Sequence, residues 1–525
     1  MTTAPAWWRS AVVYQIYPRS FCDRSGDGVG DLAGIMEHLD HLVWLGVDAL
    51  WLSPVYPSPM ADFGYDITDY CDVDPLFGSL SDMDALISAA HDAGLSVVLD
   101  WVPNHTSDRH PWFVSSRSSR SSPRRDWYIW RDPSPSGGPP NNWRAAFAGV
   151  SGTEFPPAWT YDQASGQWYL HLFLSEQPDL NWSNPAVQSA MTATLRFWLE
   201  RGVDGFRMDV IHAIAKDPDL PDLPPERSPI PMCAWIDDPA CHPLVSLIRS
   251  AVKDANPDAV VIGEIVLPSV AQVASYYGRP AEPELDLAFN FHPLHARWDA
   301  AVWRRQIDLA VSEIAPVGWP AWALGNHDNP RQRTRYGSEA RARAAAVLLL
   351  TQMGTPFLYA GEELGLADAA VAPERLVDPG GRDGCRAPIP WTPAAGHGWA
   401  GEPWLPWPPQ ASSGRDVESM RSTPGSTLDL YRRLLAARRA SPALSLGSFA
   451  WLPSGRAAEP VLAYRRERDG DERVVAVNFS ESPATLDLPG GSWAVEVSTH
   501  PRRASAVPNP LELRGDEAVV LRPGR

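Results

Sequence analysis

The stretch VDGFRMDV, residues 203–210, is a short apolar run that ends in a cation and a carboxylate. A run of this length predicts a β-strand, and side chains two residues apart lie on the same face of a strand. Arg207 and Asp209 therefore share one face. A neighbouring cation keeps a carboxylate ionised, as a nucleophile or an electrostatic stabiliser requires. The stretch thus predicts a strand with a chemical site at its end.

Similar apolar runs recur from residue 11 to about residue 360, and they alternate with longer segments of helical periodicity. The predicted strands are 11–17, 47–53, 95–101, 203–209, 259–264, 285–290, 321–326 and 355–359. The predicted helices are 80–93, 185–201, 242–254, 297–313 and 338–352. Eight strands with interleaved helices indicate an α/β protein, and they favour a (β/α)8 TIM barrel over an open doubly wound sheet.

Long insertions interrupt this alternation at 104–177, 216–241 and 363–412. The first is too long for a simple connection, so it predicts a small subdomain inserted after strand 3. From about residue 444, short runs of period two predict a C-terminal antiparallel β domain. The expected domains are a catalytic barrel (domain A, 1–103 and 178–443), the inserted subdomain (domain B, 104–177) and a β-sandwich (domain C, 444–525).

Composition excludes several classes of protein. The net charge of −18 argues against a nucleic-acid partner, because nucleic-acid binders carry basic stripes. No apolar run is long enough to span a bilayer, and the N-terminus lacks the features of a signal peptide. We therefore predict a cytoplasmic protein with no membrane partner, and the five scattered cysteines are expected to be reduced.

Ionisable residues stand at the C-terminal ends of four predicted strands, where catalytic residues of barrel enzymes lie. They are Asp100, Asn104 and His105 after the third strand, Arg207 and Asp209 on the fourth, Glu264 on the fifth, and His327 and Asp328 after the seventh. Each alone could be a salt bridge or a helix cap, but together they indicate a site. Paired carboxylates fit glycosidic bond cleavage. We expect the apolar run VVIGEIV to keep Glu264 protonated, while Arg207 keeps Asp209 charged.

Four motifs at these strand ends, DWVPNH, GFRMDV, GEIV and NHDNPR, resemble in order the signature regions of the α-amylase family of glycoside hydrolases (family 13). QPDLNW at 177–182 resembles the region that marks its oligo-1,6-glucosidase and α-glucosidase branch. The resemblance extends over nearly the whole chain. The resemblance implies a retaining mechanism in which Asp209 is the nucleophile, Glu264 is the acid/base and Asp328 binds sugar hydroxyls.

The resemblance also implies substrate-binding residues. Asp62 would hydrogen-bond the terminal glucose, Tyr65 would stack beneath it, and an arginine assigned to Arg386 would pair with Asp62 to close the pocket. The full predicted set is Asp62, Tyr65, His105, Phe147, Phe173, Arg207, His327 and Arg386. Phe147 and Phe173, from the inserted subdomain, could contact the sugar ring or belong to the core.

The branch implies an exo-acting α-glucosidase that cleaves short α-linked gluco-oligosaccharides from the nonreducing end and also transfers glucose to sugar or alcohol acceptors. Val210 resembles members that act on α-1,6 links, but one side chain leaves α-1,4 and α-1,6 linkages both open. Trehalose synthase and sucrose isomerase or hydrolase activities share the motifs. A non-catalytic transporter ectodomain is disfavoured, because the catalytic residues are present and no membrane anchor is found. The chain could be a monomer or a small homo-oligomer.

An acidic loop follows the first predicted strand, with oxygen-bearing groups at Asp23, Ser25, Asp27, the Val29 carbonyl and Asp31. Their order is that of the first positions of an EF-hand loop, but the twelfth position is Gly34 in place of glutamate. A strand precedes the loop, which excludes a helix–loop–helix regulator. The resemblance to branch members that bind a divalent ion here favours a structural Ca²⁺, with Mg²⁺ as an alternative. No organic cofactor is expected.

Overall fold

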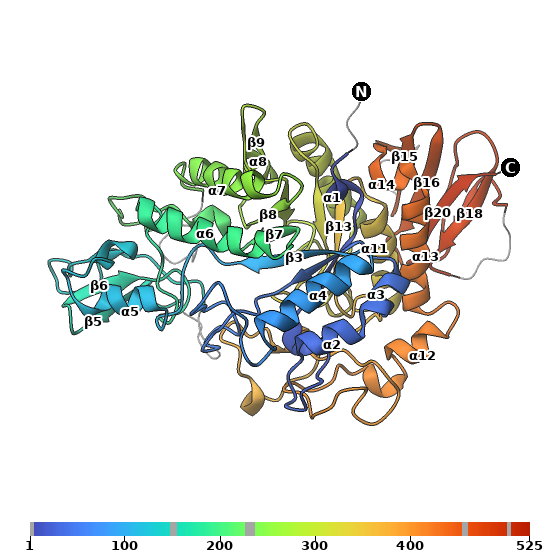
Figure 1. Cartoon of the computed structure of the whole chain (residues 1–525). Coiled ribbons are helices and arrows are strands. Elements are labelled where there is room, and N and C mark those ends of the chain that lie inside the picture. Colours follow the sequence, from blue (N-terminus) through green and yellow to red (C-terminus); the bar gives the residue numbers. More distant parts are fainter. Residues whose placement is uncertain (1–4, 148–154, 226–236, 454–459, 501–505, 525) are drawn as a thin grey trace.

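A computed structural model of the chain describes residues 5–147, 155–225, 237–453, 460–500 and 506–524 (Figure 1). Its central feature is a closed barrel whose eight strands pair in the order β1-β13-β12-β11-β8-β7-β3-β2. The strands are β1 (Val13–Ile16), β2 (Ala49–Leu52), β3 (Ser96–Trp101), β7 (Gly205–Met208), β8 (Val260–Ile265), β11 (Leu287–Asn290), β12 (Ala321–Ala323) and β13 (Thr355–Tyr359). Every neighbouring pair is parallel. The predicted TIM barrel and its eight strands are confirmed.

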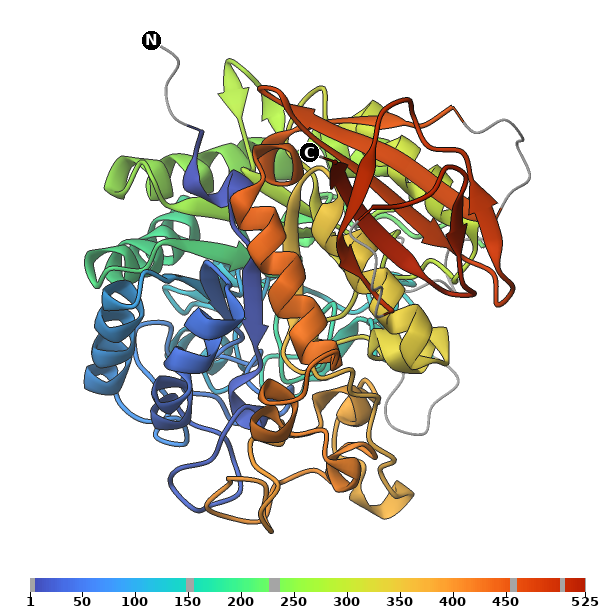
Figure 2. The ribbon, with the colours of Figure 1, turned by 90° about the vertical axis from the view of Figure 1, so that its right-hand side faces the viewer.

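Helices surround the barrel, as the periodicity of the sequence predicts (Figures 1 and 2). The five predicted helices correspond to α4 (Leu80–Asp92), α6 (Pro185–Glu200), α7 (Cys241–Ala255), α9 (Ala300–Leu309, continued by a π turn to Ile314) and α11 (Glu339–Thr351). The others are α1 (Trp7–Ser10), α2 (Leu32–Glu37), α3 (Leu39–Leu45), α5 (Pro111–Ser118), α8 (Val270–Ser275), α10 (Gln332–Tyr336), α12 (Val417–Arg421), α13 (Thr427–Ala440) and α14 (Pro442–Leu446). The side chain of Asn184 caps α6 at the amide of Ala186, with Pro185 in the first position.

Apolar side chains fill the barrel interior and hold its strands together. They include Val98, Val260, Ile262, Phe289 and Phe357, all buried. A Cβ atom added at Gly205 would lie 2.4 Å from the carbonyl oxygen of Val260. Only glycine allows β7 and β8 to approach so closely, which explains why this residue interrupts the apolar run. The site residues on β7 and β8 therefore rest on a closely packed base.

The inserted subdomain after β3 carries α5 and a three-stranded antiparallel sheet of order β4-β6-β5. Its strands are β4 (Trp130–Arg131), β5 (Trp159–Asp162) and β6 (Gln167–Leu170). At the opposite side of the barrel lies the C-terminal antiparallel domain (Figure 1). Both parts are confirmed, whereas the exact domain boundaries stay predictions.

The C-terminal domain has a five-stranded sheet of order β14-β15-β16-β20-β18 and a pair, β17 and β19. Its strands are β14 (Ser448–Trp451), β15 (Val461–Arg468), β16 (Asp471–Asn478), β17 (Ala484–Leu486), β18 (Trp493–Ser498), β19 (Leu511–Leu513) and β20 (Ala518–Pro523). One further pair, β9 (Gly278–Arg279) and β10 (Glu282–Pro283), follows α8. The five-stranded sheet packs against α11 and α13 (Figure 2). This domain supports the barrel away from the inserted subdomain.

Two expectations from composition concern the whole chain. Among the helices that the structure describes, none is both long and apolar enough to cross a membrane. Cys22, Cys71, Cys241 and Cys385 are free thiols, and Cys233 lies outside the described residues.

Candidate active site

A cavity of about 310 Å³ opens at the C-terminal ends of the barrel strands. The predicted site residues that line it are Asp62, Tyr65, His105, Phe147, Phe173, Asp209, Glu264 and Asp328. The other three, Arg207, His327 and Arg386, lie behind this lining and contact it. Residues from distant parts of the chain thus meet in one pocket, although their roles stay predictions.

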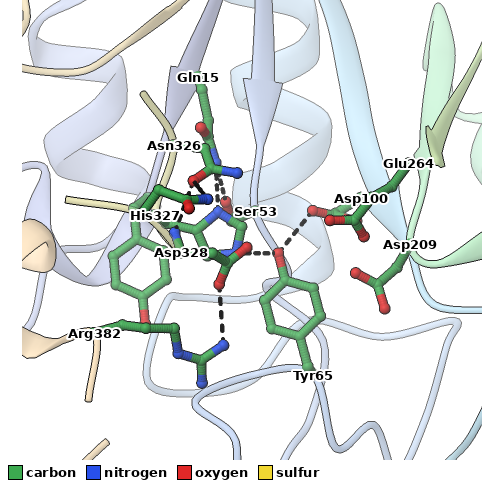
Figure 3. A network of polar contacts seen from close by, with 12 residues as sticks. Gln15, Ser53, Tyr65, Asp100, Asp209, Glu264, Asn326, His327, Asp328 and Arg382 are labelled. Atoms are coloured by element: carbon green, nitrogen blue, oxygen red, sulfur yellow. Dashed lines mark hydrogen bonds and ion pairs between the residues drawn. The ribbon is translucent and has the colours of Figure 1, made fainter. Parts of the chain in front are cut away.

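Arg207 is the centre of this site, and its three carboxylate partners, Asp100, Asp209 and Glu264, lie close together in Figure 3. Its Nη1 lies 2.7 Å from Asp209 Oδ1 and 2.8 Å from Asp100 Oδ1, and its Nη2 lies 2.7 Å from Glu264 Oε2. The guanidinium is also 5.2 Å from the centre of the Trp51 ring. Only 1% of the Arg207 side chain is exposed, so it cannot turn away. One cation therefore sets the positions of three carboxylates.

This contact corrects the expectation that Arg207 distinguishes the two catalytic acids. The guanidinium pairs with Glu264 as closely as with Asp209. Burial raises the pKa of Asp209 well above its usual range; Arg207 opposes this shift, and Glu264 and Asp100 add to it. Three carboxylates around one cation cannot all ionise in a buried site at low cost. Burial and the neighbouring carboxylates therefore favour the protonated form of Asp209, against the pull of Arg207.

A tight turn after β7 places a backbone donor on Glu264. Val210 has φ 34° and ψ 41°, a left-handed conformation that is costly for a β-branched residue. In this conformation the Val210 amide lies 3.0 Å from Glu264 Oε2 and donates to it. The turn thus links the strand of Asp209 to the carboxylate of Glu264.

The other side of the pocket is closed by ion pairs of Arg382. Its Nη1 lies 3.0 Å from Asp328 Oδ1, and its Nη2 pairs with Asp62. Arg386 contacts Asp378 at 3.0 Å and Asp328 at 3.3 Å. The prediction that Arg386 pairs with Asp62 is therefore wrong, and Arg382 makes that contact. The loop places Arg386 one helical turn further on, fully buried behind Asp328.

These contacts govern the charge of Asp328. Burial alone would raise its pKa, but His327, Arg382 and Arg386 together hold the pKa well below its usual range. His327 itself is fully buried, and burial lowers the pKa of its imidazole to about 3. Asp328 is thus ionised and His327 neutral at physiological pH.

Gln177 is a site residue that sequence reasoning missed. Its Nε2 lies 3.0 Å from Asp62 Oδ2 and 3.0 Å from His105 Nε2, so one amide orients two residues of the lining. Burial lowers the pKa of His105 to about 3, which keeps this imidazole neutral. Gln177 is the first residue of QPDLNW. This motif indicates the branch of the family, but it does not reveal the contacts of Gln177.

Two aromatic rings complete the pocket. The centroids of Phe147 and Phe173 are 5.7 Å apart, and Phe173 lies 5.2 Å from His105. The guanidinium carbon of Arg382 is 4.9 Å from the centre of the Phe147 ring. Both phenylalanines line the cavity, where they present apolar surface to a ligand.

The carboxylates of the acidic loop after β1 accept hydrogen bonds from backbone amides. Asp23 accepts hydrogen bonds from the amides of Gly26 at 2.7 Å, Gly28 at 3.0 Å and Gly401 at 2.8 Å. Asp31 caps α2 at the Gly34 amide, and its other oxygen accepts two amides of the loop. Across the described ranges, no three His, Cys, Asp or Glu side chains are grouped to hold a metal. In this structure the amides of the loop and of Gly401 donate to the carboxylates of Asp23 and Asp31, so the loop holds its own shape.

Comparisons with known proteins agree with the fold and the site. The model of the family described as "Alpha amylase, catalytic domain" matches residues 15–447. A probable alpha-glucosidase of Rhizobium meliloti is 41% identical over 515 residues, covering 92% of this chain and 91% of its own length. An oligo-1,6-glucosidase of Heyndrickxia coagulans is 36% identical, covering 93% and 94%.

Two crystal structures are also similar to this chain. The alpha-glucosyl transfer enzyme XgtA is 41% identical with a TM-score of 0.89, covering 99% of this chain and 100% of its own. The trehalulose synthase MutB of Pseudomonas mesoacidophila MX-45 is 36% identical with a TM-score of 0.90 and the same coverage. The chain belongs to the alpha-amylase family of glycoside hydrolases, which confirms the resemblance seen in its motifs.

The two arginines of the 363–412 loop are expected to respond differently to substitution. Arg382→Ala should lower kcat/KM on an aryl α-glucoside about 100-fold or more, because it removes a buried ion-pair partner of two pocket carboxylates. Arg386→Ala should mainly lower the melting temperature, because it removes a fully buried cation and leaves Asp378 paired with Arg382 alone. Steady-state kinetics and thermal unfolding measure both effects, with the exposed Arg375→Ala as control. A larger loss of kcat/KM in Arg386→Ala than in Arg382→Ala would contradict the assignment of Arg382 as the partner of Asp62.

Proposed function

We propose that the chain is an exo-acting, retaining α-glucosidase that removes glucose from the nonreducing end of short α-linked gluco-oligosaccharides and α-glucosides. The observation that carries this proposal is the pair Asp209 and Glu264, held by one guanidinium in a small pocket. The cavity of about 310 Å³ is at the small end of ligand sites, which favours a single sugar unit over a long chain. Arg382 ties Asp62 to Asp328 across it, so the pocket is closed at that side.

In the first step, Asp209 attacks the anomeric carbon while Glu264 protonates the departing glycosidic oxygen. Glu264 must therefore carry a proton when the bond breaks. A positively charged glucosyl centre approaching Asp209 favours its ionised form, which moves the proton to Glu264. Arg207 keeps its contact with both carboxylates during this exchange, so the nucleophile stays aligned.

In the second step, Glu264 takes a proton from water, and the resulting hydroxide attacks the anomeric carbon to release Asp209. Two inversions at one carbon retain its configuration. A sugar or alcohol hydroxyl that replaces water at this step yields a transfer product. The same residues therefore support both hydrolysis and glucosyl transfer.

The remaining pocket residues fit the recognition of one glucose. The carboxylates of Asp62 and Asp328 can accept hydrogen bonds from sugar hydroxyls. Phe173 and Tyr65 offer apolar faces to the ring. Since Arg382 neutralises both carboxylates, the pocket can hold acidic side chains close together without strong repulsion.

Asp209→Asn and Glu264→Gln test this mechanism. Each should lower the rate of aryl α-glucoside hydrolysis by about 10²–10⁴-fold or more, because a positioned proton donor or nucleophile is lost. Release of the aryl group measures the rate, and circular dichroism checks the fold. The exposed Glu282→Gln serves as a control for a charge change outside the pocket. Retention of more than a tenth of the activity in either catalytic variant would refute the role assignment.

A sucrose-rearranging activity is the second candidate, favoured by the similarity to a trehalulose synthase. Analysis of the products formed from maltose, isomaltose and sucrose distinguishes the two candidate functions. We expect free glucose as the main product from at least one of the first two, with transfer products rising at high sugar concentration. An isomer of sucrose as the dominant product would favour the second candidate. The ratio of maltose to isomaltose hydrolysis decides the preferred linkage.

A structural Ca²⁺ in the acidic loop stays a separate proposal, supported by the order of its oxygen-bearing residues. Millimolar Ca²⁺ should raise the melting temperature by about 2 °C over a chelated sample, because an ion that binds only the folded state stabilises it. Asp27→Ala should remove this difference. An unchanged melting temperature in the wild type would refute the ion. A cytoplasmic location also stays a prediction.

A further inference from the structure

A chain of hydrogen bonds runs behind the pocket from Gln15 on β1 to Asp100 (Figure 3), which in turn accepts from Arg207. Gln15 Nε2 lies 2.8 Å from His327 Nδ1, and His327 Nε2 lies 2.6 Å from the Tyr65 hydroxyl. That hydroxyl lies 2.9 Å from Asp100 Oδ2, and the other oxygen of Asp100 accepts from Arg207 at 2.8 Å. Gln15 does not line the pocket, yet it is connected to Arg207.

The carboxylate end gives the chain a direction. Both oxygens of Asp100 serve as acceptors, Oδ1 from Arg207 at 2.8 Å and Oδ2 from the Trp51 indole at 3.3 Å as well as from Tyr65. Tyr65 must then donate its single proton to Asp100, and its oxygen accepts from His327. Because His327 is neutral, with a pKa lowered to about 3 by burial, only one ring nitrogen carries a proton. That nitrogen must be Nε2.

The opposite end of the chain requires the same tautomer. The amide group of Gln15 donates from Nε2 to His327 Nδ1 and, at 3.2 Å, to Ser53 Oγ. Its Oε1 has no hydrogen-bond partner in the part of the chain that the structure describes. An NH₂ group can only donate, so it matches an unprotonated Nδ1. The other tautomer would place two donors face to face.

Two neighbouring rings prevent the imidazole of His327 from rotating out of this arrangement. Its ring lies between Tyr17, at a centroid distance of 5.6 Å and 17°, and Tyr65, at 5.3 Å and 5°. The same Nε2 lies 3.3 Å from Asp328 Oδ2. A proton on Nε2 therefore faces both the Tyr65 oxygen and a pocket carboxylate.

We propose that Gln15 is a positioning residue that fixes His327 in the Nε2–H tautomer and thereby directs the Tyr65 proton to Asp100. Asp100 in turn holds Arg207 in line with the catalytic carboxylates. The inference rests on the proposed glucosidase function. With a proton on Nδ1, His327 would draw the Tyr65 proton to itself. Asp100 Oδ2 would then keep only the longer contact from Trp51 Nε1, at 3.3 Å. Asp209 would then be less well aligned, and kcat would fall.

The variants Gln15→Met and Gln15→Glu test whether the donor at position 15 sets the tautomer of His327. Methionine keeps the length of the side chain but removes the donor, so kcat on an aryl α-glucoside should fall about tenfold, the effect of one hydrogen bond. KM should change less than about threefold, because position 15 is outside the pocket lining. A packing role alone would lower the melting temperature without changing kcat per folded molecule.

Gln15→Glu adds a signature in the pH profile. A protonated carboxyl at this position can donate to Nδ1 as the amide does, whereas an ionised one can only accept and favours Nδ1–H. kcat should therefore fall more than 100-fold as pH rises through the pKa of the new carboxyl, a loss absent from the wild type and Gln15→Met. The charged and titratable groups around His327 are the same in all three proteins; they are Tyr17, Tyr65, Asp100, Arg207, Asp328, Arg382, Cys385 and Arg386.

The control is Gln352→Met, which changes another buried glutamine at the end of α11, far from the pocket lining. It should keep the wild-type kcat. If the wild type itself does not cleave the glucoside, the proposed function fails. If the wild type is active but Gln15→Met keeps kcat within twofold, or Gln15→Glu has the wild-type pH profile, this inference fails alone. If Gln15→Glu does not fold, the kcat of Gln15→Met decides.

Discussion

One buried guanidinium organises this protein's active site. Arg207 is the shared partner of Asp100, Asp209 and Glu264, which come from three neighbouring strands. Burying such a charge is costly unless its partners are held in place, so the barrel must fix all three carboxylates at once. The ion cluster and the fold therefore depend on each other. Burial within the same cluster raises the pKa of Asp209.

The strand register supplies this geometry. Arg207 on β7 stands opposite Asp100 on β3 and opposite Ile262 on β8, two residues before Glu264. Because parallel strands direct their C-terminal ends to one rim, the charged groups reach the same side of the packed interior. The chemistry thus lies on strands, whereas Asp62, Phe173 and Arg382 on the connecting segments close the pocket around it.

Prediction from sequence succeeded wherever the answer depended on position along a strand or helix. The eight strands, the five helices and the rim location of Asp209, Glu264 and Asp328 follow from local patterns. It failed where two similar side chains compete for one partner. Arg382 and Arg386 lie four residues apart in one loop, and nothing local decides which reaches Asp62. Gln15 and Gln177 were missed because an amide becomes functional only through what it contacts.

The sequence by itself determined the barrel, its inserted and C-terminal parts, the family and the residues at the strand ends, because apolar periodicity and short motifs are local properties of the chain. The tertiary structure decided how the charges are shared. Pairing of Arg207 with Glu264 as well as Asp209, the direction of the Gln15–His327–Tyr65 hydrogen bonds and the amide-closed acidic loop all depend on distances between distant segments. Coulombic and hydrogen-bond interactions act over a few ångströms in space, and sequence separation does not encode those distances.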